Sequence, residues 1–142
     1  MIISDTYLKA FVQNNSEYYL PQLEDRSAIR FNYAALIFGA LWFLHRKMRL
    51  YGLVFFAITI VALVLTYNMV SFLPLLTACF IALGVLGMIH CALGLVANRV
   101  YIAFVRNQIA SLSSSHSNET YLLNSLQNRG GTSHVLDDYF IP

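Results

Sequence analysis

Charged residues are scarce in this chain. Asp, Glu, Lys and Arg make up 11% of its 142 residues, whereas a typical soluble domain is about 25% charged. None of them lies between residues 50 and 98. This composition excludes an ordinary water-facing surface over that stretch, and a net charge of +2 is too small to favour nucleic-acid binding. We therefore expect membrane lipids, and no nucleic acid, around this part of the chain.

Residues for metal, redox or hydrolytic chemistry are also sparse. Cys79 and Cys91 lie on one expected helix, about 18 Å apart along its axis, which is too far for a disulfide. The histidines are scattered, without the close spacing of zinc ligands; they are His45, His90, His116 and His134. No GxSxG, P-loop or GxGxxG motif occurs. The sequence thus predicts no catalytic residue, no metal and no cofactor.

The uncharged run is long enough to cross a membrane twice. Residues 50–98 would form about 74 Å of α-helix, and the hydrocarbon core of a bilayer is about 30 Å thick. Polar and helix-breaking residues gather near its middle; they are Tyr67, Asn68, Ser71 and Pro74. We predict transmembrane helices over residues 50–67 and 75–98, joined by a turn.

Basic residues flank both ends of the predicted hairpin. They are Arg46, Lys47 and Arg49 before it, and Arg99 and Arg106 after it. The positive-inside rule places both flanks in the cytoplasm. The apolar residues 31–44 would reach only about 20 Å, and a crossing there would put Arg30 on the opposite face from Lys47. This favours an interfacial or re-entrant segment; a tilted third crossing stays open.

The stretch FNYAALIFGALWFLHRKM, residues 31–48, resembles the signature of an uncharacterised bacterial membrane family, domain-of-unknown-function family 2628. The matching residues are Phe31, Asn32, Ala34, Ala35, Phe38, Gly39, Trp42, Arg46, Lys47 and Met48. Tyr33, Ala40 and His45 stand where the family usually has Trp, Pro and Tyr. A further likeness is the Ala97-Asn98 pair followed by Tyr101. The resemblance covers roughly residues 18–108 and implies a bacterial inner-membrane protein, but no reaction.

Aromatic and basic residues beside the short apolar segment have the composition of a membrane-interface anchor. The predicted anchor residues are Tyr33, Trp42, Arg46, Lys47 and Arg49. We expect the two aromatic rings at headgroup depth and the basic side chains facing anionic lipid. Asn32 is predicted to cap the short helix and dock it on the hairpin.

Small residues line one face of each predicted span. In the first they are Gly52, Thr59, Ala62 and Thr66, and in the second Gly84, Gly87, Cys91 and Gly94, followed by Asn98. Small faces let helices approach closely in lipid. We expect these faces to hold the hairpin together; the alternative is that part of this surface binds another copy or another membrane protein.

His90 and Asn98 are the candidate intramembrane polar residues, because ionisable and polar side chains in spans are often functional. The structural alternative for His90 is a neutral ring bonded to a backbone carbonyl or to Thr59 or Thr66. For Asn98 it is an interfacial cap or a cross-helix hydrogen bond. The spans contain no Asp or Glu, so a proton relay within one subunit has little support.

The two ends of the chain are predicted to be cytoplasmic. Residues 1–30 form an amphipathic segment whose short helix has Ser4 as N-cap; its apolar residues are Tyr7, Leu8, Phe11 and Val12. Residues 110–142 form a flexible tail with a serine-rich linker over 110–118. A short helix follows, with Asn118 as N-cap, Gly130 just past its end, and an apolar side made of Leu122, Leu123 and Leu126. The last residues, VLDDYFIP, are either a docking motif for a partner or a tail that folds back on its own cytoplasmic surface or stays disordered.

These patterns predict an all-α integral membrane protein. Its membrane domain, residues 31–109, contains a transmembrane helical hairpin and a short interfacial or re-entrant helix, with amphipathic terminal helices outside. We expect a non-enzymatic, multi-pass scaffold, accessory or interaction subunit whose partners are membrane lipids and either a membrane protein or a second copy. The alternative is an oligomeric channel or transporter subunit built from the hairpin.

Overall fold

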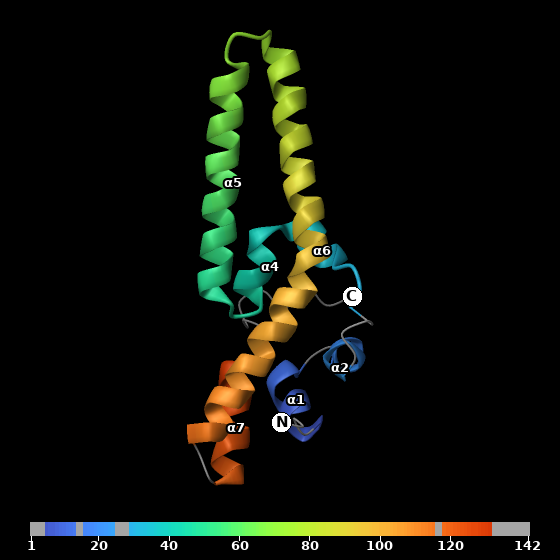
Figure 1. The fold of residues 1–142 in the computed structure, drawn as a ribbon, viewed down its shortest axis with the longest axis vertical. Helices are drawn as coiled ribbons and strands as arrows, with labels where there is room; N and C mark the ends of the chain where they lie inside the picture. The colour runs from blue at the N-terminus through green and yellow to red at the C-terminus, as the bar shows by residue number, and fades with distance from the viewer. Residues whose placement is uncertain (1–4, 14–15, 25–28, 116–117, 132–142) are drawn as a thin grey trace. The chain divides into compact units, whose positions relative to one another are not determined.

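The computed structural model describes residues 5–13, 16–24, 29–115 and 118–131. Helices in chain order are α1 (Asp5–Val12), α2 (Ser16–Glu24), α3 (Tyr33–Phe38), α4 (Ala40–His45), α5 (Arg49–Val70), α6 (Leu75–Ser115) and α7 (Glu119–Arg129) (Figure 1). No strand occurs among the described residues. The chain divides into two compact units. The hairpin unit comprises residues 31–44 and 48–97, and the terminal unit comprises residues 1–30, 45–47 and 98–142.

Two helices are long and apolar enough to cross a membrane, α5 and α6; the hairpin unit contains α5 and the first part of α6, up to residue 97. They run in opposite directions from a turn at residues 71–74, as predicted (Figure 1). In the turn, the Leu73 N–H donates to the Val70 carbonyl at 2.9 Å. α5 has 22 residues, or about 33 Å, and α6 has 41 residues, or about 62 Å. The second helix is therefore about twice as long as one crossing requires.

The serine-rich linker predicted over residues 110–118 is helical as far as Ser115, so this prediction was wrong. Three of its serine hydroxyls donate to a carbonyl one turn earlier: Ser113 to Ala110 at 3.0 Å, and Ser114 and Ser115 to Ser111 at 2.9 Å each. These bonds satisfy the side chains without breaking the helix. Ile109 and Leu112 are buried in the same stretch, so packing favours the helix.

The short apolar segment forms two six-residue helices, α3 and α4, separated by Gly39. Gly39 has φ 56° and ψ −129°, a backbone conformation that side chains with a Cβ rarely adopt. Asn32 caps α3, as predicted: its Oδ1 accepts from the Ala35 N–H at 2.8 Å. Its own N–H donates to the Gly94 carbonyl at 2.8 Å. The cap residue thus fixes α3 to α6.

The turn between α4 and α5 is a Schellman-type helix end. The Met48 N–H donates to the Phe43 carbonyl at 2.9 Å. Lys47 occupies the left-handed position of this turn with φ 57°, a place where glycine is usual. The basic signature residues therefore lie in a defined turn.

The terminal unit surrounds a second apolar core. α1 packs on α2 and α7, and the Phe11 and Phe104 ring centroids are 6.1 Å apart. The predicted amphipathic helix near the N-terminus is confirmed, with Leu8, Phe11 and Val12 buried; Ser4 lies outside the described residues.

The last described helix, α7, agrees with its prediction. The Asn118 side chain accepts from the N–H groups of Thr120 and Tyr121 at 3.0 and 3.3 Å, and Gly130 follows the helix as its C-cap. Leu122 and Leu126 are buried, while Leu123 is half-buried. The VLDDYFIP stretch lies outside the described residues.

Candidate functional site

Arg46 is buried inside the terminal unit, with 6% of its surface exposed. Its guanidinium carbon lies 4.8 Å from the Tyr19 ring centroid and 5.3 Å from that of Tyr101. Its Nη2 donates to the Tyr19 hydroxyl at 3.3 Å. The prediction that Arg46 faces anionic lipid is therefore wrong, because two tyrosine rings enclose the side chain.

The environment of Arg46 also affects Tyr19. Burial disfavours the charged phenolate and raises the pKa of Tyr19 from 10.0 to about 12, although the positive charge of Arg46 acts in the opposite direction. Tyr19 is therefore a neutral phenol at physiological pH. Its oxygen accepts a hydrogen bond from Arg46 without neutralising the guanidinium charge.

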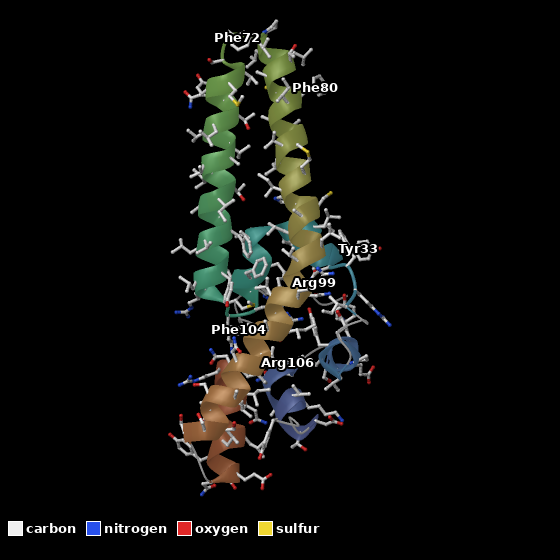
Figure 2. The ribbon with its side chains drawn as sticks, viewed as in Figure 1. Tyr33, Phe72, Phe80, Arg99, Phe104 and Arg106 are labelled. Atoms are coloured by element: carbon white, nitrogen blue, oxygen red, sulfur yellow. The ribbon has the colours of Figure 1, made fainter. Side chains whose placement is uncertain are left out.

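The other predicted anchor residues divide into two groups. Tyr33 is 72% exposed (Figure 2), and Arg49 is exposed at the start of α5, as an anchor requires. Trp42 is 5% exposed and packs on Phe43 with ring centroids 5.0 Å apart, so the prediction of a headgroup-facing ring is wrong. Lys47 is half-buried, and its Nζ donates to the Gly130 carbonyl at 2.7 Å.

Asn98 is fully buried and forms the centre of a polar network in the terminal unit. Its amide nitrogen lies 2.8 Å from the Arg30 carbonyl, 3.0 Å from the Tyr18 hydroxyl and 3.3 Å from Gln22 Oε1. Gln22 in turn accepts from the Arg30 N–H at 3.0 Å and donates to the Tyr18 carbonyl at 2.8 Å. Asn98 is thus a cross-helix hydrogen-bond donor, the structural alternative stated for it above.

His90 has a comparable structural role in the hairpin unit. Its Nδ1 lies 2.8 Å from the Leu36 carbonyl oxygen, and because a carbonyl only accepts, Nδ1 carries the proton. A Cβ at Gly39 would lie 2.8 Å from His90 Nε2, so the ring packs directly on the glycine. The backbone-carbonyl alternative for His90 is confirmed.

On the small-residue face of α5, Gly52 is buried, and Thr59, Ala62 and Thr66 are half-buried. A Cβ at Gly52 would lie 2.4 Å from the Leu44 side chain, so this glycine accommodates α4. The threonine hydroxyls donate within their own helix, to Phe55 and Ala62 at 2.9 and 2.8 Å.

The small-residue face of α6 differs from the prediction. Gly94 is buried, where a Cβ would lie 2.4 Å from the Phe31 ring. Gly84, Gly87 and Cys91 are exposed, and a Cβ at either glycine would meet no atom within 4 Å. The expectation that these three residues hold the hairpin together is therefore wrong within one chain.

The sequence did not predict that α2 contributes to both polar clusters, the one around Arg46 and the one around Asn98. Tyr18, Tyr19 and Gln22 all lie on this helix, which contains Pro21, a residue that argues against helix in a sequence. Arg106 on α6 donates to the Leu23 carbonyl in the last turn of α2 (Figure 2). One sequence signal was the resemblance to the family at the Ala97-Asn98 pair and Tyr101. Of these residues, Asn98 and Tyr101 contact side chains of α2.

The arrangement brings together hydrogen-bond donors, neutral phenols and one buried cation. Among the described residues, no group of three or more His, Cys, Asp or Glu side chains could hold a metal ion. The geometry can therefore bind an acidic group or hold helices together.

No curated protein and no solved structure matches the chain. A family model does match, over residues 7–107, and this range includes both signature stretches and the residues around Arg46 and Asn98. The chain therefore belongs to the family described as Protein of unknown function (DUF2628).

Proposed function

We propose that this protein is a multi-pass bacterial inner-membrane protein in which α5 and the first part of α6, residues 75–98, cross the bilayer. The apolar surfaces of the hairpin support this: Phe72 and Leu75 at its turn are 81% and 80% exposed (Figure 2). The basic residues at both flanks support cytoplasmic termini.

The segment 31–44 is proposed to enter the cytoplasmic leaflet and return. Its contacts lie near the end of each proposed span that is flanked by basic residues. On α6 it reaches Gly94 and His90. On α5, Phe43 packs on Phe55, with ring centroids 4.7 Å apart. The break at Gly39 leaves each half only about 9 Å long, which supports a re-entrant course.

Labelling of single cysteines tests this topology in a chain without Cys79 and Cys91. Cysteines at Arg30 and Arg49, both exposed, flank the re-entrant segment and should react only from the cytoplasmic side. A cysteine at Phe72 should react only from the other side and serves as the control. Reaction of the Arg30 and Arg49 positions from opposite sides would show that residues 31–44 cross the bilayer.

For the biochemical role, we propose a non-enzymatic scaffold or interaction subunit that binds another membrane protein or a second copy. The observation that carries this is the exposed face of α6 at Gly84, Gly87 and Cys91. In lipid, such a face permits close helix approach. His90 and Asn98, the polar candidates for another role, are engaged in hydrogen bonds that support the fold.

Native purification with identification of the co-purified proteins tests this role. Gly87→Leu should remove the partner, whereas Met88→Leu, at a 66% exposed position on the same helix, should retain it. Crosslinking through Cys91 separates a second copy from a different protein. An unchanged partner set in Gly87→Leu would contradict the assignment of this face.

Measuring ion flux through the reconstituted protein distinguishes the channel alternative from the scaffold proposal. The scaffold proposal expects no flux above that of empty vesicles. Flux that is lost in His90→Ala, in protein that still folds, would favour an oligomeric pore over the scaffold.

A further inference from the structure

Arg46 carries a positive charge that no described residue compensates. Its side chain is 6% exposed, whereas the acidic side chains that the structure describes, Asp5, Glu17 and Glu119, lie at the surface. Its Nη2 bonds to the Tyr19 hydroxyl at 3.3 Å, which is longer than the usual range of about 2.7–3.2 Å. Nε and Nη1 have no hydrogen-bond acceptor among the described residues. A buried cation in this state strongly favours an anion beside it.

The two tyrosines around the guanidinium do not supply this anion. The guanidinium carbon lies 4.8 Å from the ring centroid of Tyr19 and 5.3 Å from that of Tyr101, and such contacts offset part of the lost hydration. Burial raises the pKa of both tyrosines, so both are neutral phenols at physiological pH. Arg46, Tyr19 and Tyr101, here called the Arg46 cluster, therefore carry one positive charge and no negative charge.

The Arg46 cluster presents hydrogen-bond donors that no described acceptor meets. Nε and Nη1 each carry such an N–H, and each forms an edge of the guanidinium together with Nη2. An edge of this kind binds two oxygens of one anion. The Tyr19 oxygen accepts from Nη2, and as a neutral phenol it keeps an O–H that can donate in turn. The ligand that fits these donors is an anion with several oxygens.

The enclosure of Arg46 is weakest on the side of α2. Tyr19 lies on this nine-residue helix, which contains Pro21, and a proline inside a helix removes one backbone hydrogen bond. Tyr101 lies on α6, which has 41 residues. Because Nε and Nη1 are themselves shielded from solvent, an anion reaches them only when a ring moves aside. The short helix and the long bond from Nη2 assign this movement to Tyr19.

We propose that Arg46 and Tyr19 form a binding site for a phosphate group. One edge of the guanidinium holds two of its oxygens, and the Tyr19 hydroxyl donates to a third. A carboxylate has two oxygens, which one guanidinium edge already uses, so a phosphate matches the donors more fully. The phosphate enters the enclosure, and this distinguishes the site from the surface contact with lipid that the sequence predicted for Arg46.

Two sources can supply the phosphate group. Arg46 lies three residues before Arg49, the first residue of α5, so its Cα is within about 11 Å of the start of a proposed span. The headgroup of an anionic lipid and free phosphate are therefore both close at hand. The lipid source rests on the proposed membrane topology, which cysteine labelling tests separately, whereas the site itself does not.

Thermal unfolding of the full chain in a phosphate-free detergent tests the site and its source. Inorganic phosphate is compared with sodium chloride of equal ionic strength, and phosphatidylglycerol with diacylglycerol, which lacks the phosphate. A probe that binds should raise the unfolding midpoint by roughly 3–6 °C at ten times its dissociation constant. A shift with inorganic phosphate supports the site and identifies free phosphate; a shift with phosphatidylglycerol alone supports it and identifies the headgroup. No shift with either probe would overturn the proposal.

Substitutions separate Arg46 from the other basic residues of the flank. Arg46→Lys keeps the charge but loses the paired N–H groups, so it should lose most of the shift. Arg49→Gln removes an exposed charge three residues away and should keep the shift. An equal loss in the two variants would show that general attraction of anions to the basic flank causes the shift, and would overturn the proposal.

A further measurement does not require an Arg46 variant to fold. Tyr19→Phe keeps the ring beside the guanidinium and removes only the hydroxyl donor. It should raise several-fold the concentration of the probe that gives half of the maximal shift. Tyr121→Phe, at a 58% exposed position on α7, should leave that concentration unchanged. Equal concentrations for the two variants would overturn the proposal.

Discussion

His90 donates from Nδ1 to the backbone carbonyl of Leu36 across 2.8 Å. That carbonyl lies in the last turn of α3, where helix carbonyls lack a partner within the helix. The histidine therefore satisfies an acceptor that the break at Gly39 creates. One side chain on α6 thus lets residues 31–44 break their helix at Gly39 in apolar surroundings without leaving the Leu36 carbonyl unsatisfied.

We expect His90→Ala to lower the free energy of unfolding by about 1–3 kcal/mol, because the Leu36 carbonyl would lose its donor. His90→Gln, whose amide can donate, should recover part of this loss. Thermal unfolding of the purified protein measures both. Met88→Ala, at an exposed position two residues away, is the control, and a loss of the same size there would contradict the assigned bond.

Gly39→Ala should be among the most damaging single substitutions in the hairpin unit. The backbone at φ 56° and ψ −129° costs about 1–3 kcal/mol for a residue with a Cβ, and that Cβ would lie 2.8 Å from His90 Nε2. Gly84→Ala, where a Cβ meets nothing within 4 Å, should be neutral or stabilise the helix by up to about 1 kcal/mol. Similar folded yields for the two variants would refute this.

Asn98→Asp should destabilise the terminal unit although the side chains are nearly identical in shape. The amide donor would become an acceptor facing the Arg30 carbonyl and Gln22 Oε1, and a buried polar group without its partner costs about 1–3 kcal/mol. Arg99→Gln removes the charge of the next residue, which is exposed, and should have little effect. Unfolding midpoints measured at neutral pH test this prediction, and the midpoint of Asn98→Asp should be lower than that of Arg99→Gln.

The stability of the protein should fall at alkaline pH because of Tyr19. The pKa of Tyr19 is about 12 in the folded chain and 10.0 as the ordinary value, so the unfolded chain loses this proton first. The stabilisation is fully present below pH 10 and is lost between pH 10 and 12, by roughly 3 kcal/mol in total. Unfolding midpoints measured across this range should fall less steeply in Tyr19→Phe; parallel curves would exclude Tyr19 as the cause.

The local features of the fold were predictable from the sequence, and those that depend on distant neighbours were not. Asn32 and Asn118 cap helices through side chains that act within three residues, so their roles follow from short-range chemistry. The environment of Arg46 depends on Tyr19 and Tyr101, which are far away in the sequence. No local pattern distinguishes a basic residue facing lipid from one enclosed by aromatic rings.

The orientation of the glycine face on α6 illustrates the same limit. A helical period identifies which residues share a face, and Gly84, Gly87 and Cys91 do share one. The period does not say which face meets a neighbouring segment, because that depends on how residues 31–39 pack against α6. Phe31 and the Gly39 break occupy the positions at Gly94 and His90, and this packing leaves the three small residues exposed.

The contact between the first and the last described helices has a consequence for how the chain is made. The Gln13 side chain donates to the Gln127 carbonyl at 2.6 Å, across 114 positions of sequence. At about 5–20 residues per second, a ribosome needs roughly 6 to 23 seconds to proceed from Gln13 to Gln127. During that interval the apolar residues of α1 have no α7 to pack against. The core that α1 and α7 share therefore cannot form until α7 has been synthesised, long after α1.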